Sequence, residues 1–373
     1  MQIIGRQDID KLFALVKAGG YDLFGPTVRD GAIIYDRIEG VEDLPIGWQD
    51  RQEKGIYRLE KTAEPTLFAY AVGPQSWKKF LHPPEYRLWK AQKKENGFEL
   101  IPEIKDEEKR KPAFIGVRSC ELNAILIQDK IFLEGQQIDK VYQSVREEAF
   151  IIAVNCTHPS GTCFCVSMNT GPRVKEAFDL SLTEVFGEGR HYFIAEAGST
   201  KGEEVLRKVP SEPARENEVA TREAILERTA AKMGRTLDTT NMKELLYANL
   251  EHPRWDEVAN RCLSCGNCTM VCPTCFCTTV EDKTDLTGEH AERWSKWDSC
   301  FSLDFSYIHG GTVRSSVRSR YRQWMTHKLA TWIDQFGTSG CVGCGRCITW
   351  CPVGIDITEE AAAIRNSSQT EQK

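Results

Sequence analysis

The stretches CLSCGNCTMVCP (Cys262–Pro273) and CVGCGRCITWCP (Cys341–Pro352) carry the same pattern, C-x2-C-x2-C-x3-C-P. Three cysteines at this spacing bring their thiolates to one side of a loop, which suits a [4Fe–4S] cluster. Where two such runs occur in one chain, the fourth cysteine of each run ligates the other cluster. We therefore expect two clusters with four ligands each: Cys262, Cys265, Cys268 and Cys351 for the first, and Cys341, Cys344, Cys347 and Cys272 for the second.

Zinc sites and disulfides also use several cysteines, and both alternatives fit this chain less well. Zinc sites typically combine two separated C-x2-C pairs. Disulfide frameworks belong to small secreted domains, whereas this chain has 373 residues. The N-terminal segment contains Asp8 and Asp10 and lacks the features of a signal peptide. Fifteen cysteines without an export signal predict a cytoplasmic protein whose thiols bind metals.

Composition argues against two classes of partner. The net charge of −6 disfavours a nucleic acid. No apolar run approaches the roughly 18 residues that cross a bilayer, so we expect no membrane contact. The sequence also has no G-x-G-x-x-G or Walker-type loop, so nothing indicates that this chain itself binds nicotinamide, flavin or ATP.

The order of elements predicts an α+β fold with an N-terminal α/β domain at residues 1–200. AFIGV (Ala113–Val117) and AFIIAVN (Ala149–Asn155) are predicted to be buried strands, and Cys120–Leu133 between them has helical periodicity. A strand, a helix and a strand of these lengths form a βαβ unit, so the sheet should be partly parallel. Further apolar segments with the character of strands are GAIIYD (Gly31–Asp36), TLFAYAVGP (Thr66–Pro74) and HYFIAE (His191–Glu196).

A mainly helical domain is predicted at residues 218–373, after a linker rich in Gly, Pro, Lys and Glu at residues 201–217. EVATREAILERTAAKM and NMKELLYANL contain good helix formers. Because a long insert separates the cysteine motifs, we expect an expanded, helical two-cluster ferredoxin-type domain. The insert contains a basic stretch that is either a solvated helix face or a positive patch that offsets the clusters or binds an acidic partner. Its residues are Arg314, Arg318, Arg320 and Arg322.

Four of the seven remaining cysteines are candidates for a third site. Cys120 follows one predicted parallel strand and Cys156 follows the other, and the carboxyl ends of such strands lie side by side. Cys163 and Cys165 come shortly afterwards in the loop THPSGTCFC. Free cysteine is also a common small core residue. The strand ends and the C-x-C loop nevertheless favour a third [4Fe–4S] cluster on these four thiols.

Cys275, Cys277 and Cys300 are the last three thiols. They have three possible roles: a cluster with a non-cysteine fourth ligand, packing against the other sites, or tuning of their potentials through S–H contacts. We favour a structural or tuning role and assign them no ligand role. The seven histidines lack paired spacing, which argues against a histidine-ligated metal site.

Segments around the motifs resemble one protein family over nearly the whole chain. They look like the iron–sulfur β subunit of cytoplasmic [NiFe] hydrogenases of the sulfhydrogenase, or bidirectional NAD(P)-linked, type. The electron-transfer subunit of anaerobic sulfite reductase is similar in the same segments. The segments are EHPRWDEVANRCLSCGNCTMVCPTCFCTTVED, RWSKWDSC, SVRSRYRQW, GCVGCGRCITWCPVGIDI, FIGVRSCELNAI and NCTHPSGTCFC, and more loosely FGPTVRDGAIIYD and GPQSWKKFLHPP.

The resemblance implies a non-catalytic electron-transfer subunit of an oxidoreductase complex. The implied partners are a flavin/NAD(P)-binding subunit, together with the small and large hydrogenase subunits; these partners would carry out hydride transfer and H2 cleavage. Three alternatives stay open: an electron-transfer subunit that serves sulfite reductase subunits, a free ferredoxin-like carrier, and an enzyme with its substrate at the N-terminal domain. The sequence shows no catalytic acid–base constellation, and we assign no catalytic residue.

Overall fold

The computed structural model describes residues 1–101 and 111–370. Its largest element is an eight-stranded sheet made of β1 (Gln2–Gly5), β2 (Tyr21–Arg29), β3 (Ala32–Arg37), β8 (Lys111–Val117), β9 (Phe150–Val154), β10 (Leu180–Gly187), β11 (Arg190–Ala197) and β12 (Glu212–Pro213). The strand order is β12-β1-β11-β10-β9-β8-β2-β3. The central neighbours β10, β9, β8 and β2 are parallel, and the outer pairs are antiparallel. The predicted partly parallel sheet is thus confirmed.

Helices cover both faces of this sheet because its central strands are apolar on both sides. All five residues of β9 are buried. Ile152 packs with α1 (Ile9–Ala18) and α5 (Thr200–Leu206) on one face. Ile151 packs with α3 (Ser119–Phe132) and α4 (Lys140–Glu148) on the other. The predicted βαβ unit is therefore present as β8, α3 and β9, and it fixes where α3 begins.

The segment Thr66–Pro74 is not a strand, so that prediction is wrong. Its apolar side chains are buried, but its backbone groups bind charged side chains instead of a neighbouring strand. Glu184 accepts hydrogen bonds from the amides of Leu67 and Phe68 at 2.6 and 2.8 Å. Arg118 donates to the carbonyl oxygen of Phe68 at 2.8 Å. Buried polar backbone must find partners, and an apolar run does not reveal that distant charged residues supply them.

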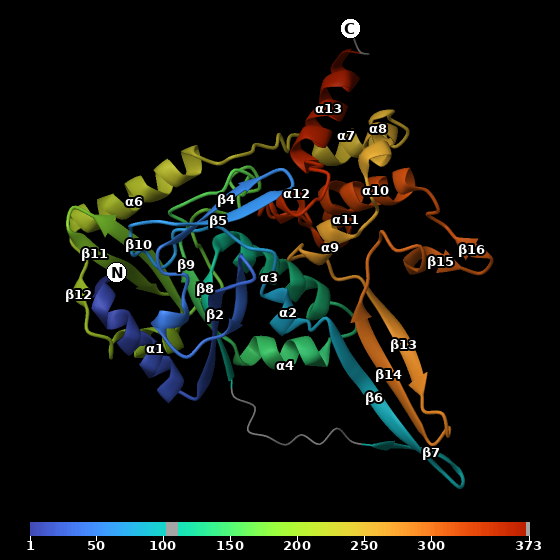
Figure 1. The fold of residues 1–373 in the computed structure, drawn as a ribbon, viewed down its shortest axis with the longest axis horizontal. Coiled ribbons are helices and arrows are strands. Elements are labelled where there is room, and N and C mark those ends of the chain that lie inside the picture. The colour runs from blue at the N-terminus through green and yellow to red at the C-terminus, as the bar shows by residue number, and fades with distance from the viewer. Residues whose placement is uncertain (102–110, 371–373) are drawn as a thin grey trace.

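A four-stranded antiparallel sheet projects from the body as a long arm (Figure 1). Its strands are β6 (Glu85–Lys94), β7 (Gly97–Ile101), β13 (Thr278–Thr284) and β14 (His290–Trp297). Strands β13 and β14 lie in the insert between the cysteine motifs, which we expected to be helical, and β14 pairs with β6. Because that partner strand comes from the N-terminal half of the chain, local propensity could not indicate the pairing.

The rest of the C-terminal part is mainly helical, as predicted. Trp255, Met325 and Ile364 come from three different helices and share one core. The helix α9, which contains Cys268, lies against α12, which contains Cys347, so the two cysteine motifs face each other. The helical elements are α7 (Met242–Ala248), α8 (Arg254–Arg261), α9 (Asn267–Met270), α10 (Val317–Thr326), the π-helix η4 (His327–Thr331), α11 (Trp332–Phe336), α12 (Arg346–Thr349) and α13 (Ile357–Thr370).

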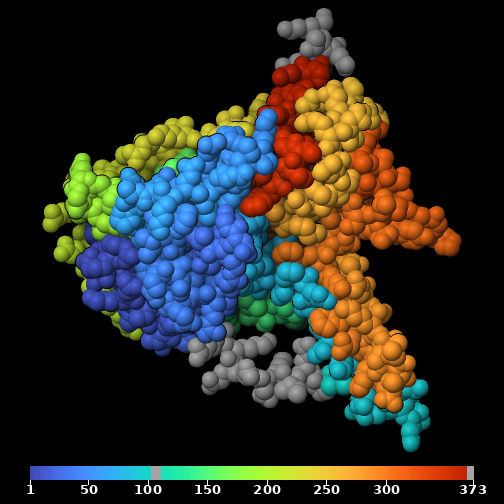
Figure 2. Space-filling view, in the orientation of Figure 1, coloured from blue at the N-terminus to red at the C-terminus, as the bar shows by residue number. Residues whose placement is uncertain are grey.

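The N-terminal and C-terminal parts are packed together through the hairpin of β4 (Trp48–Glu53) and β5 (Ile56–Lys61). The amide of Gly55 donates to the carbonyl oxygen of Ile348 at 3.2 Å, and Thr349 donates to the side chain of Gln52 at 2.8 Å. Figure 2 shows the light-blue hairpin region against the red C-terminal segment.

The stretch predicted as a linker is largely structured. It contains most of α5 and all of β12, and the predicted domain start at residue 218 falls inside α6 (Glu216–Ala231), which lies against β11. In the described part of the chain, no helix is both long and apolar enough to span a membrane. The remaining short elements are η1 (Arg6–Asp8), η2 (Val41–Asp43), α2 (Lys78–Leu81), η3 (Asp304–Ser306), β15 (Tyr307–Ile308) and β16 (Gly311–Thr312).

Candidate metal centre

The two cysteine motifs have the same local backbone shape. Ser264 and Gly343, each directly before the second cysteine of its motif, both have left-handed backbone with φ of +52° and +65°. Gly266 and Gly345, each directly after that cysteine, have φ of +74° and +76°. Left-handed residues on both sides of the cysteine curl each loop tightly. Each loop therefore turns its first two thiols toward the third, which lies in the short helix that follows.

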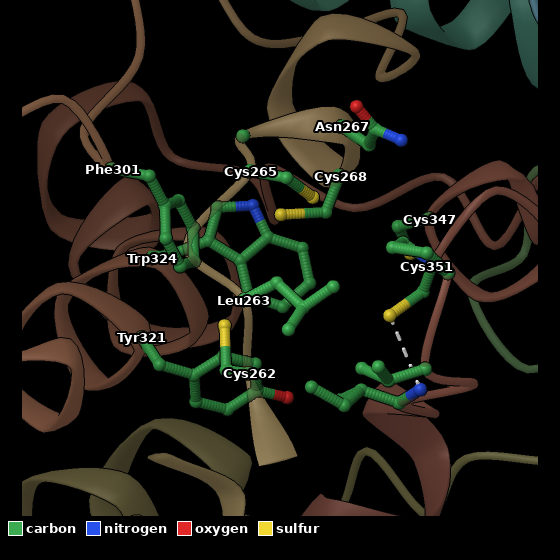
Figure 3. Close-up of a pocket in the computed structure, with 14 residues that line it drawn as sticks. Cys262, Leu263, Cys265, Asn267, Cys268, Phe301, Tyr321, Trp324, Cys347 and Cys351 are labelled. Atoms are coloured by element: carbon green, nitrogen blue, oxygen red, sulfur yellow. Dashed lines mark hydrogen bonds between the residues drawn. The ribbon is translucent and has the colours of Figure 1, made fainter. Parts of the chain in front are cut away.

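The first site gathers Cys262, Cys265, Cys268 and Cys351, whose sulfur atoms point into a common pocket (Figure 3). Cys351 comes from the other motif, and Cys347 of that motif also lines this pocket. The arrangement is compatible with the crossed ligand assignment, which stays a prediction. The pocket walls are apolar and include Phe301, Tyr321 and Trp324. Cys265 is exposed and the neighbouring Leu263 is 63% exposed, so this site opens at the surface of the chain.

Polar groups at the first site suit an anionic sulfur-rich group. The amides of Ser264 and Ile355 donate to the sulfurs of Cys262 and Cys351 at 3.4 and 3.3 Å. The indole nitrogen of Trp324, which lines the pocket, is buried without a hydrogen-bond partner among the described residues. A cluster held by the four thiolates would supply an acceptor for that donor.

The second site gathers Cys272, Cys341, Cys344 and Cys347 around an enclosed pocket. Phe164, Val342 and Ile357 line it with apolar surface, so this site is deeper than the first. The buried ammonium of Lys328 donates to the sulfur of Cys272 at 3.1 Å. Sequence reasoning missed this contact, because a single lysine in a helical segment carries no local signature.

The four N-terminal thiols also come together. Cys120 lies at the start of α3, directly after β8, and Cys156 follows β9. The thiols of Cys120 and Cys165 interact electrostatically with each other and with Cys156, and Cys163 also interacts with Cys156. Cys120, Cys163 and Cys165 are buried. Parallel-strand topology therefore brings the predicted third set to one edge of the sheet.

A buried arginine supports the fit of an anionic group at this edge. Arg118 is 2% exposed, and its Nη2 donates to the carbonyl oxygens of Phe68 and Tyr70 at 2.8 Å. Its Nη1 is buried without a hydrogen-bond partner among the described residues. Arg118 acts electrostatically on Cys156. A thiolate-bound anionic cluster would place a negative charge and an acceptor beside this guanidinium, whereas neutral thiols would supply neither.

Burial keeps these thiols protonated in the chain without a metal. It raises the pKa of Cys163 to about 12, although the hydroxyl of Ser160, 3.1 Å from the sulfur, acts in the opposite direction. Burial likewise raises the pKa of Cys120 and of Cys165. Because metal ligands are thiolates, loading this site must release protons.

The second and third sites are in contact through their loops. The amide of Phe164 donates to the carbonyl oxygen of Gly343 at 2.9 Å. The hydroxyls of Thr162 and Thr349 are 2.7 Å apart. Cys120 and Cys165 both interact electrostatically with Cys344 of the second site. The three sets of thiols therefore form a continuous series from the exposed first site to the sheet edge.

Cys275, Cys277 and Cys300 lie beside the first two sites. Cys275 interacts with Cys272, and Cys300 interacts with Cys277 and Cys268. This position is compatible with the structural or tuning role, which stays a prediction.

Within the described residues, no three His, Cys, Asp or Glu side chains are arranged to hold a single metal ion.

The basic stretch is used mainly inside the chain. Arg318 and Arg322 form ion pairs with Glu251 at 2.8 and 2.7 Å. Arg320 is buried and donates to the hydroxyl of Ser264 at 3.3 Å. These contacts fix α10 beside the first motif. Arg320 also acts electrostatically on Cys262, and Arg314 acts on Cys300, so a charge that offsets the cluster sites stays a prediction.

Comparisons with known proteins agree with this chemistry. A family model described as a 4Fe-4S dicluster domain matches residues 261–355. The chain is similar to the protein named sulfhydrogenase 2 subunit beta of Pyrococcus furiosus, with 31% identity over 291 residues, which are 77% of this chain and 82% of that protein. No solved structure matches. The dicluster match confirms the expectation of [4Fe–4S] clusters in the C-terminal part.

Proposed function

This chain belongs to the family of iron–sulfur β subunits of hydrogenases, and we propose that it relays electrons between a flavin/NAD(P)-binding subunit on one side and the catalytic hydrogenase subunits on the other. It is an iron–sulfur electron-transfer subunit that contains a 4Fe-4S dicluster domain. The proposal adds the identity of its partners and a third cluster on Cys120, Cys156, Cys163 and Cys165.

The observation that carries the proposal is the continuous series of thiol sites. One end opens at Cys265, which is exposed, and the other end lies at the edge of the large sheet. Cys344 lies between them and interacts with Cys120 and Cys165. A relay needs redox sites close enough together for electrons to pass, and it needs an end that a partner can approach.

The chain's own residues hold, shield and polarise these sites. Bound [4Fe–4S] clusters would supply reversible one-electron chemistry. Phe164 and Trp324 present apolar walls that exclude water, and backbone amides and Lys328 donate to ligand sulfurs. Burial and hydrogen bonds to sulfur are two means by which a protein sets the reduction potential of a cluster.

The test is the cofactor content of the complex that a tag on this chain retrieves under anaerobic conditions from its native host. We expect nickel, flavin and iron to co-purify, with NAD(P)H reducing the clusters. A Cys351→Ser variant should retain the partners but lose reduction through the first site. Siroheme without nickel would instead assign the chain to sulfite reduction, and iron on a lone chain would leave a free carrier.

A further inference from the structure

Lys328 is a buried ammonium without a carboxylate partner. It is 3% exposed and lies in the π-helix η4, an irregularity that often marks functional positions. Its Nζ donates to Cys272 Sγ at 3.1 Å, to Thr274 Oγ1 at 3.1 Å and to the carbonyl oxygen of Gly340 at 3.4 Å. Among residues 1–101 and 111–370, no Asp or Glu forms an ion pair with it. A buried charge needs an opposite charge nearby.

The second site is where that opposite charge would be. Cys272 is one of its four thiols, and the pocket that these thiols surround is lined by Lys328 itself. Two other buried cations lie near this site. Arg346 interacts with Cys344 but is neutralised by Glu121 at 2.6 Å. Lys78 interacts electrostatically with Cys272, but its Nζ donates to the carbonyl oxygen of Cys275. Among these three, Lys328 is the cation that has no carboxylate ion pair in the described chain and donates directly to a ligand sulfur.

The first site has no equivalent contact among the described residues, although its motif has the same spacing. The hydrogen bonds to its sulfurs come from the backbone amides of Ser264 and Ile355. A buried guanidinium, that of Arg320, does act electrostatically on Cys262. Its hydrogen bonds, however, go to the hydroxyl of Ser264 and to the carbonyl oxygens of Arg314 and Ser315 rather than to a sulfur. Two motifs with the same cysteine spacing thus differ in one respect: a charged side chain donates directly to a ligand sulfur at the second site.

We infer that Lys328 sets the reduction potential of the cluster at the second site above that of the cluster at the first site, an inference that rests on the proposed function. One-electron reduction adds one negative charge to a cluster and its thiolates, and an ammonium that donates to a ligand sulfur stabilises the more negative state. Lys328 is a positioning and tuning residue: it makes the buried second site the place where an arriving electron is held.

The test is an EPR-monitored potentiometric titration of the anaerobically purified holo-complex, with iron counted in each variant. In Lys328→Met we expect one reductive step to move to more negative potential while the others stay. Lys328→Arg keeps the charge and should remain close to the wild type. Lys78→Met is the comparison that separates a direct hydrogen bond from charge nearby. Lys78 is also buried, at 4% exposure, and interacts electrostatically with Cys272, but its Nζ donates to the carbonyl oxygen of Cys275 at 3.0 Å and not to a sulfur, so its removal should shift the step less.

The outcomes distinguish failure of the inference from failure of the proposed function. The inference would be overturned if all reduction potentials stayed unchanged in Lys328→Met, or if they shifted equally in Lys328→Met and Lys78→Met. Either result would leave the proposed electron relay standing. If Lys328→Met loses iron, the titration is repeated with Lys328→Gln, which keeps a hydrogen-bond donor but has no charge. A shift of one reductive step to more negative potential in Lys328→Gln supports the inference, and no shift overturns it. A wild-type chain without iron–sulfur signals would overturn both the inference and the proposed function.

Discussion

The amide of Phe164 donates a hydrogen bond to the carbonyl oxygen of Gly343 at 2.9 Å. This bond joins the loop that carries Cys163 and Cys165 to the loop of the second cysteine motif. Gly343 has φ of +65°, and a Cβ at this position would lie 2.6 Å from the carbonyl carbon of Phe164 and 2.7 Å from the Cα of Cys165. Two proposed cluster sites therefore depend on one close backbone approach.

Gly343→Ala should destabilise the chain and separate the second and third sites. The left-handed backbone costs an alanine about 1–2 kcal/mol, and the contact with backbone atoms adds a steric cost that cannot be relieved by moving a flexible side chain. We expect a lower thermal midpoint and less bound iron than in the wild type. Gly337→Ala is the control, since Gly337 has φ of +68° with nothing within 4 Å. Equal effects of both substitutions would contradict the steric argument.

Cys165→Ser should remove the third cluster and leave the dicluster domain intact. A [4Fe–4S] cluster that loses a cysteine ligand is expected to be lost or unstable, so iron should fall by about four atoms per chain. The measurement is iron and sulfide content with EPR of the reduced protein. Cys277→Ser, at a thiol without a proposed ligand role, should keep the wild-type iron count. An unchanged count in Cys165→Ser would argue that the N-terminal thiols are only core residues.

His82 should make the chain less stable in mild acid. Burial lowers its pKa to about 4, and the ammonium of Lys78 acts in the same direction. Below the ordinary histidine pKa of about 6.5, His82 binds a proton in the unfolded chain but not in the folded chain. The free energy of unfolding therefore decreases as pH falls. From pH 6.5 to pH 5 the loss should be about 1.6 kcal/mol, because the slope approaches about 1.4 kcal/mol per pH unit only once the unfolded histidine is mostly protonated.

Urea midpoints across this pH range check the prediction. His82→Gln should flatten the pH dependence, because its side chain does not titrate. The same change at His309, which is exposed, should preserve the wild-type slope. A slope that persists in His82→Gln would show that another group is responsible.

Glu121 and Arg346 should behave as one unit. Their ion pair spans 2.6 Å between side chains that are 1% and 0% exposed. Removing one partner leaves a buried charge, so Glu121→Gln and Arg346→Met should each cost about 3–5 kcal/mol in the free energy of unfolding. The double variant should cost clearly less than the sum, as a double-mutant cycle would measure. Simple additivity would mean that the pair is not coupled. Glu39→Gln, at an exposed pair with Lys17, is the control and should shift the midpoint little.

Much of the site could be predicted because its information is local. The spacing from Cys262 to Cys272 and from Cys341 to Cys351 specifies two loops, and a parallel β8–β9 pair brings Cys120 and Cys156 to one sheet edge. The irregular segment at Thr66–Pro74 and the strands β13 and β14 could not be predicted, because distant residues satisfy their backbone groups. Glu184 binds the first, and β6 binds β14.

Cysteine spacing was enough to indicate the [4Fe–4S] chemistry of this protein: within each motif it brings three thiols to one side of a loop, since a short loop leaves little conformational freedom. How the sites differ from one another depends on the folded chain. Folding placed Lys328 against Cys272, left the nearby Arg346 neutralised by Glu121, and left Cys265 at the surface. Burial and charge pairing arise from contacts between segments far apart in the chain, and no local pattern encodes them.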